Sequence, residues 1–114
     1  MIGGGIAGVA TALELAERGI DVVLLEKGEI AAEQSSRNWG WCRQMGRDAR
    51  EIPLIQIALK LWDGMDARVG AETGFTRCGI VYLCETEAQL GQRASWFEKN
   101  AKPYGLSSRM VSAK

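Results

Sequence analysis

The sequence of 114 residues predicts an α/β fold, and three consecutive patterns near its start support that class. Closely spaced glycines at positions 3, 5 and 8 mark a tight loop. Apolar residues then recur at helical intervals, and an unbroken apolar run follows at 22–25. A loop, a helix and a buried strand in this order are typical of a βαβ unit in a parallel sheet.

The first helix is predicted over residues 5–18. Ile6, Ala10 and Leu13 lie at the three- and four-residue spacings of one helical face. Gly19 follows, and glycine readily adopts the left-handed conformation that ends a helix. The helix should therefore begin directly at the glycine loop.

The strand predicted at 22–25 is continuously apolar and rich in β-branched residues, as expected for a strand buried on both faces. A βαβ unit also needs a strand before the glycines, yet only Met1 and Ile2 precede them. We therefore expect the sequence to start inside that strand and to represent an N-terminal part of a longer protein.

Residues 28–52 lack a clear period and include the polar, tryptophan-containing stretch "SSRNWGWCRQMGRDARE". We interpret this segment as a long loop with room for a short helical turn. Long loops inside compact domains are often functional, although a solvated linker would have a similar composition.

A second helix is predicted over residues 53–68, because Pro53 suits the first turn and apolar residues follow at helical spacing up to Gly70. "FTRCGIVYLCE", residues 75–85, is predicted as a strand. Four residues alternate on one face of this strand and should lie in a core: Cys78, Ile80, Tyr82 and Cys84.

Thr86 and Gln89 match a capping box and predict a further helix, which should continue to about residue 101 and end before Gly105. The last residues, 106–114, resemble the start of another strand. No repeat or low-complexity tract interrupts this order.

The composition excludes several kinds of chemistry. Fourteen basic and fourteen acidic residues give zero net charge, which offers no electrostatic reason to bind nucleic acid or an anionic membrane. We do not expect the first residues to be a signal peptide, because they show no basic region before an apolar run, and no apolar stretch is long enough to span a bilayer. Without histidine, the chain cannot supply a Ser-His-Asp triad or a His-ligated zinc site. Three scattered cysteines fit a reducing cytoplasm, and no metal site is predicted.

The glycines match G-x-G-x-x-G, a motif in which each glycine has a physical role. Gly3 permits the tight turn, Gly5 allows close approach of a pyrophosphate, and Gly8 lets the helix pack against the sheet. The helix then directs its free N–H groups toward the anion. Glu26 follows Gly8 by 18 residues, near the spacing of an acid that binds a ribose hydroxyl. The same acid disfavours a ribose that carries a phosphate, because the two negative groups would repel each other. The alternative to a dinucleotide site is a plain glycine turn with a surface glutamate.

The stretch "IGGGIAGVATALELAERGIDVVLLEKG" resembles the opening of the flavoprotein family that includes D-amino-acid oxidase, glycine oxidase and sarcosine oxidase. The resemblance implies a Rossmann-like FAD-binding βαβ unit over residues 1–74. It also implies the beginning of a mixed-sheet substrate domain over residues 75–114. FAD is the implied cofactor.

The resemblance also implies the residues that contact the cofactor. Arg43 stands where sarcosine oxidases have an arginine facing the flavin ring, where its charge would stabilise the anionic reduced flavin. Two further groups are implied: the loop and acid residues Gly3, Gly4, Gly5, Ile6, Ala7, Gly8, Glu26 and Lys27, and the following loop residues Ser35, Ser36, Asn38, Gly40 and Trp41.

The activity implied by this family is oxidation of a small amine or amino acid, in which hydride leaves the C–H beside nitrogen and an imine forms. The family's catalytic residues fall mostly beyond Lys114, so no residue of this chain is assigned a catalytic role. Two alternatives stay open from the sequence: a part of an NAD-linked dehydrogenase, and a non-catalytic remnant. The substrate and the oligomeric state are not determined by the sequence.

Overall fold

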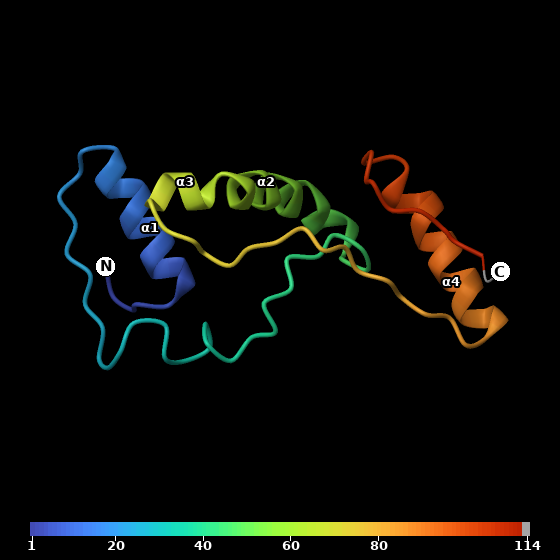
Figure 1. Ribbon diagram of the computed structural model, residues 1–114, viewed down its shortest axis with the longest axis horizontal. Helices are drawn as coiled ribbons and strands as arrows, with labels where there is room; N and C mark the ends of the chain where they lie inside the picture. Colours follow the sequence, from blue (N-terminus) through green and yellow to red (C-terminus); the bar gives the residue numbers. More distant parts are fainter. Residues whose placement is uncertain (113–114) are drawn as a thin grey trace. The chain divides into compact units, whose positions relative to one another are not determined.

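A computed structural model describes residues 1–112, which divide into two compact units, Met1–Trp41 (unit 1) and the described residues from Cys42 onward (unit 2). The helices and their order are shown in Figure 1. Among the described residues, no helix is both long enough and apolar enough to cross a membrane. The predicted domain boundary after residue 74 stays a prediction.

Unit 1 contains helix α1 (Ile6–Glu17), close to the predicted bounds. Gly5 precedes its first turn, and Gly19 follows with the expected left-handed φ of 74°. The N–H groups of Arg18 and Gly19 reach back to the last carbonyls of the helix. The prediction of this helix from spacing and glycine positions is confirmed.

The start of unit 1 pairs in parallel with the segment that follows α1, through an isolated bridge between Ile2 and Leu25. Leu25 donates its N–H to the carbonyl of Met1 at 3.0 Å, and Gly3 donates to Leu25 at 2.8 Å. This direction is the one a βαβ unit requires. The full strand predicted at 22–25 is absent from the described residues, since a parallel ladder grows only between neighbouring strands and residues 1–3 supply a single short partner.

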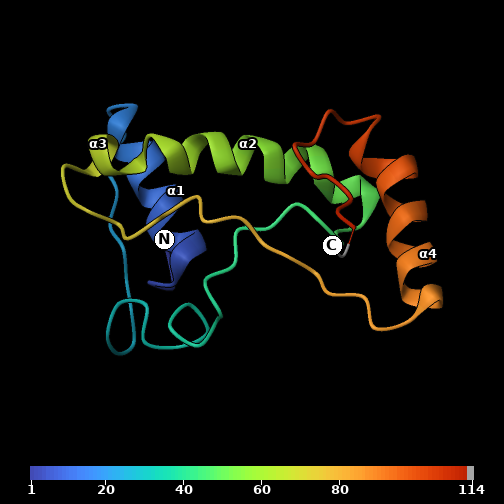
Figure 2. The same ribbon diagram turned by 45° about the vertical axis from the view of Figure 1, so that its right-hand side comes forward.

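The segment predicted as a long loop, from residue 28 to the start of α2, is irregular as predicted, and its short helical turn is η1 (Ala49–Glu51), capped by the carboxylate of Asp48. Helix α2 (Ile52–Asp63) starts with Pro53 in its first turn and is followed by α3 (Met65–Val69). Figure 2 shows α2 and α3 nearly in line, with the interruption at Gly64. Gly70 ends α3 with a left-handed φ of 68°, so the helical prediction is confirmed apart from this break.

The strand predicted at 75–85 is wrong for the described chain, because no β-ladder forms there. The segment runs back along α2 as extended backbone in both views (Figures 1 and 2). Phe75 stacks on Trp62, and Arg77 binds Asp63, so side chains hold it. No neighbouring strand among residues 1–112 covers it, which leaves three of the four predicted core residues exposed: Cys78, Ile80 and Cys84.

Helix α4 (Glu87–Trp96) begins where the capping box predicted, with Thr86 accepting a hydrogen bond from the N–H of Gln89. It continues as η2 (Phe97–Ala101), a π-helical turn. The strand predicted at 106–114 does not form over 106–112, and residues 113–114 lie outside the described residues. Three hydrophobic side chains are buried within the described residues, all in unit 2: Ile52, Leu59 and Ala101.

Candidate functional site

The glycine loop turns directly onto the start of α1. Gly3 has a φ of 99°, which L-residues with a side chain rarely adopt. A Cβ at Gly8 would lie only 1.9 Å from the carbonyl oxygen of Gly3. Because that oxygen belongs to the backbone, no side-chain adjustment could accommodate the extra atom. The two outer glycines of the motif are therefore required by geometry.

The two remaining glycines lie under the segment that follows Glu26. A Cβ at Gly4 would approach the Ile30 side chain to 2.5 Å, and one at Gly5 would lie 3.1 Å from the hydroxyl of Ser35. Ala31 also donates its N–H to the Gly4 carbonyl at 2.9 Å. The loop is thus covered at close range on one side, and a larger residue at Gly4 or Gly5 would require the side chain of Ile30 or Ser35 to move.

Glu26 accepts two backbone hydrogen bonds, one on each carboxylate oxygen. Gly4 donates to Oε2 at 2.7 Å, and Gly28 donates to Oε1 at 3.0 Å. These bonds, with the one from Gly4 the stronger, hold the pKa of the Glu26 carboxyl below its usual value. The side chain is therefore a carboxylate near neutral pH, with its charge directed at the glycine loop.

Ser35 supplies the cap that α1 lacks in its own sequence. Gly5 has no side chain to accept a hydrogen bond from the first turn. The hydroxyl of Ser35 accepts one from the N–H of Ile6 at 2.8 Å, across 29 residues of sequence. The first turn of a helix leaves N–H groups without intrahelical partners, so an oxygen at this place is stabilising.

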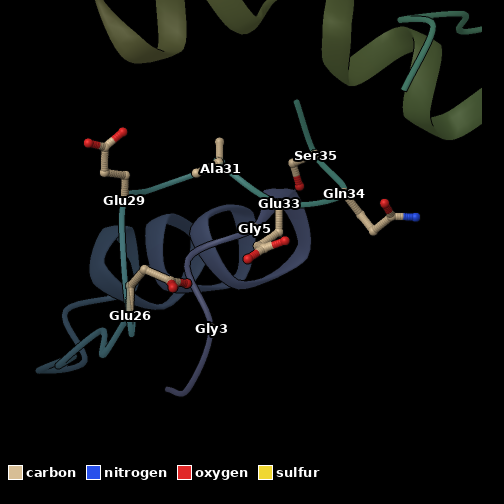
Figure 3. A pocket seen from close by; sticks show the side chains of 9 residues that line it. Gly3, Gly5, Glu26, Glu29, Ala31, Glu33, Gln34 and Ser35 are labelled. Carbon is tan, nitrogen blue, oxygen red and sulfur yellow. The ribbon is translucent and has the colours of Figure 1, made fainter. Parts of the chain in front are cut away.

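A cavity of about 250 Å³ lies between the glycine loop and the segment after Glu26. In Figure 3, Glu26 and Ser35 point toward the loop, whereas Glu29 points away from it. The lining residues all belong to unit 1: Gly3, Gly5, Glu26, Glu29, Ala31, Ala32, Glu33, Gln34 and Ser35.

The structure therefore brings together part of the predicted set: the glycines, Ile6, Glu26 and Ser35. Ala7 lies in the same first turn of α1 and accepts a hydrogen bond from Thr11. Lys27 is exposed and forms an ion pair with Glu33 at 3.5 Å. That pair places the lysine charge beside the cavity lining, without a hydrogen bond to the loop.

The other predicted residues make contacts within their own turns. Ser36 donates its hydroxyl to the carbonyls of Ala32 and Glu33. Asn38 accepts a hydrogen bond from the N–H of Gly40 at 2.6 Å. These bonds shape the loop that follows Ser35.

Two predicted residues close to the end of that loop are placed differently. Trp41 packs edge-on against Trp39, with ring centroids 5.2 Å apart, and more than half of its surface is exposed. Arg43 belongs to unit 2, where it binds Met45 and Tyr82. The role assigned to Arg43 at a flavin ring stays a prediction.

Sequence reasoning missed the residues that cover the loop, chiefly Ile30 and Ala31. Ala31 has a φ of 63°, a left-handed conformation unusual for a residue other than glycine. Nothing in its type signals this. The glutamates on either side of it, at positions 29 and 33, do not indicate this conformation either. Only the folded structure therefore identifies the residues that cover the loop.

The arrangement has a clear chemical capacity. The backbone N–H groups at the start of a helix favour an anionic oxygen, and glycines let that oxygen approach closely. An ionised carboxylate at the end of the adjacent segment can accept hydrogen bonds from neighbouring hydroxyl groups. These features fit a molecule that carries both a phosphate and a sugar. The glycine loop and the Glu26 carboxylate both border the cavity that such a molecule would occupy.

Comparisons with known proteins bear on this site. A family model described as FAD dependent oxidoreductase matches residues 1–114. The chain is 29% identical over 96 residues to glycine oxidase of Geobacillus kaustophilus, covering 78% of this chain and 26% of that protein. It is 32% identical over 89 residues to the mitochondrial pyruvate dehydrogenase phosphatase regulatory subunit of Mus musculus, covering 77% of this chain and 10% of that protein.

Among solved structures, L-amino acid deaminase from Proteus vulgaris matches with a TM-score of 0.84 and 34% identity. The match covers 95% of this chain and 25% of that one. The chain thus spans between a tenth and about a quarter of the length of these two curated relatives.

Proposed function

Because the chain belongs to the family of FAD-dependent oxidoreductases, we propose that its glycine loop and Glu26 hold FAD for the oxidation of an amine or amino acid. The observation that carries the proposal is the pairing of a loop that only glycine can form with an ionised carboxylate directed at it. A Rossmann-like βαβ unit at residues 1–74 and the start of a mixed-sheet substrate domain at 75–114 are part of the same proposal.

The residues of the loop have distinct tasks in this proposal. The N–H groups at the start of α1 bind the pyrophosphate, and Gly5 leaves room for it. Glu26 accepts hydrogen bonds from the ribose hydroxyls. Ser35 already caps the N–H of Ile6, so its hydroxyl lies beside the pyrophosphate site. Ser36, Asn38, Gly40 and Trp41 shape the loop toward the flavin.

The chemistry that FAD supplies when bound is acceptance of a hydride from the C–H bond next to the substrate nitrogen, which leaves an imine. The residues of this chain bind and orient rather than react. Arg43 would hold a positive charge beside the flavin ring and favour negative charge there. Similarity to proteins named glycine oxidase and L-amino acid deaminase supports an amine or amino acid as the substrate class.

The test is a titration of FAD into the 114-residue chain, followed by flavin fluorescence, with NAD as the competing cofactor. Saturable binding of FAD and none of NAD is expected. Glu26→Ala should weaken FAD binding by about tenfold or more, because a charge-assisted hydrogen bond to the ribose is lost.

Glu29→Ala is the matched control. Glu29 borders the same cavity, points away from the loop (Figure 3), and should leave FAD affinity unchanged. Equal affinity of the Glu26→Ala and unsubstituted chains for FAD would contradict the proposal, and so would preferential binding of NAD.

A non-catalytic FAD-binding protein is the second candidate, and similarity to a regulatory subunit favours it. The two candidates differ in turnover. If the whole protein binds FAD but none of a panel of primary amines and amino acids bleaches the flavin absorbance under anaerobic conditions, the non-catalytic function is preferred.

A further inference from the structure

Two exposed tryptophans pack against each other in unit 1. The rings of Trp39 and Trp41 meet edge to face, with centroids 5.2 Å apart and ring planes at 80°. Trp39 is 80% exposed, and Trp41 is 55% exposed. Large apolar rings that are held together at the surface are typical of a binding site, because their free faces stay in contact with water. Neither ring belongs to a packed interior, so the fold of unit 1 does not account for the pair.

Asn38 shapes the turn that carries both tryptophans. Its side-chain amide donates a hydrogen bond to the carbonyl of Ser35, and its Oδ1 accepts one from the N–H of Gly40 at 2.6 Å. Gly40 has a φ of 67°, a left-handed conformation that glycine adopts without strain. The backbone between the two indoles is therefore fixed by side-chain hydrogen bonds and by the choice of glycine.

Ser35 connects this turn to the start of α1. Its hydroxyl accepts from the N–H of Ile6, and its carbonyl accepts from the side chain of Asn38. Together with the bond from Gly40 to Asn38, these contacts form a series of three hydrogen bonds from the first turn of α1 to the residue between the tryptophans. The aromatic pair is thus tied to the place where the pyrophosphate is proposed to bind.

The layout of FAD indicates which part of the molecule this pair would meet; this step rests on the proposed function. In FAD the pyrophosphate stands between the adenosine ribose and the flavin half. Glu26 contacts the glycine loop at Gly4, whereas Ser35 contacts it at Ile6. With the ribose at Glu26 and the pyrophosphate at the start of α1, the flavin half extends toward Ser35 and the turn that follows it.

We propose that Trp39 stacks on the flavin ring of FAD and that Trp41 holds the Trp39 ring in place by its edge-to-face contact. A flavin ring is flat and presents two apolar faces, which suit an indole whose own face is exposed. Trp39 is an addition to the residues already assigned to FAD. Because an indole also stacks on adenine, the test has to separate the two aromatic ends of FAD.

The experiment compares FAD with ADP, which carries the adenosine and the pyrophosphate without the flavin ring. Trp39→Leu removes the aromatic ring and keeps an apolar side chain. The affinity of the 114-residue chain for FAD should fall by about tenfold in this variant, the scale of loss when an aromatic side chain is removed from a stacked base. Its affinity for ADP, measured by calorimetry, should stay unchanged.

Flavin emission gives a second measurement that does not depend on affinity. An indole stacked on a flavin quenches its fluorescence, so FAD at saturation should emit more strongly on Trp39→Leu than on the unsubstituted chain. Trp39→Phe keeps an aromatic ring and should lose less FAD affinity than Trp39→Leu. Tyr104→Leu is the control: it removes an exposed aromatic ring from unit 2 and should change neither affinity nor emission.

Two results would overturn the inference: equal FAD affinity and flavin emission of Trp39→Leu and the unsubstituted chain, or an equal loss of affinity for FAD and ADP, which would assign the pair to the adenine ring. Backbone amide spectra of each variant show whether it is folded. If the unsubstituted chain fails to bind FAD, the proposed function fails as well. FAD binding that is lost in Glu26→Ala but unaffected in Trp39→Leu refutes the stacking alone.

Discussion

The two units of this chain are stabilised internally by different kinds of contact. In unit 1 the long-range contacts are hydrogen bonds in which the backbone takes part, such as those from Gly3 to the Leu25 carbonyl and from Gly4 to the Glu26 carboxylate, and none of its described side chains is buried. In unit 2 buried side chains of α2 and η2, Ile52, Leu59 and Ala101, form the packed interior. Substitutions that add a side chain at a glycine should therefore disrupt unit 1 most. Substitutions that shorten a buried side chain should destabilise unit 2 most.

The largest effect is expected from adding one methyl group to unit 1. Gly8→Ala places a Cβ against the Gly3 carbonyl oxygen, at a distance of 1.9 Å before any shift of the backbone. The loop cannot keep its path, and FAD affinity should fall by about 100-fold or more, as for strongly overpacked sites. The measurement is FAD titration by flavin fluorescence.

Gly28→Ala is the control for that change, since a Cβ at Gly28 would meet nothing within 4 Å. It should bind FAD as the unsubstituted chain does. If Gly8→Ala bound FAD equally well, the close contact would not govern the loop, and the contrast between the units would lose its main support.

The next effect comes from removing atoms from unit 2. Ile52 is 0% exposed, and Ile52→Ala should lower the free energy of unfolding by about 2–4 kcal/mol through lost burial and a cavity. Leu54→Ala, at a position that is 69% exposed, should change it by less than about 0.5 kcal/mol. Urea unfolding followed by tryptophan fluorescence measures both, and similar losses for the two variants would argue against a side-chain core.

A smaller effect separates two neighbouring serines of unit 1. Ser35→Ala removes the acceptor for the N–H of Ile6 and should destabilise the start of α1 by about 1 kcal/mol, as loss of a cap does. Ser36→Ala removes a hydroxyl that bonds only to its own turn and should have less effect on α1. Amide hydrogen exchange of Ile6 reports the difference, and equal exchange in both variants would contradict the assigned cap.

The smallest effect is the response of unit 1 to acid. The pKa of Glu26 is lowered in the folded chain, so its contribution to stability is present above the ordinary carboxyl pKa of 4.5. That contribution is lost as the pH falls through the lowered folded value. The effect should be modest, because water screens this half-exposed carboxylate.

Amide exchange of Gly4 and Gly28, measured from neutral to acidic pH after correction for the intrinsic rate, should show protection that decreases below pH 4.5. Glu26→Gln should remove the pH dependence of that protection. A pH dependence that persists in Glu26→Gln would assign the effect to another carboxyl group.

The helices were predictable because their signals are local. Helix α1 begins directly after Gly5 and ends before Gly19, and Thr86 caps α4 as its spacing with Gln89 predicts. In a capping box the Gln89 side chain would accept a hydrogen bond from the backbone N–H of Thr86. Here it accepts one from the N–H of the preceding residue, Glu85, at 2.8 Å. The segment 75–85 was predicted wrongly, since alternation indicates a strand only where a neighbouring strand completes the ladder.

By itself, the sequence determined where the glycine loop, the helices and the acidic residue at position 26 lie along the chain, because glycine conformation and helical periodicity act over a few residues. Only the tertiary structure decided which oxygen caps α1, what covers Gly4, and which tyrosine Arg43 contacts. These contacts join residues far apart in the sequence, such as Gly4 with Glu26 across 22 positions and Arg43 with Tyr82 across 39. Such contacts depend on the path of the chain between the partners, which no local pattern specifies.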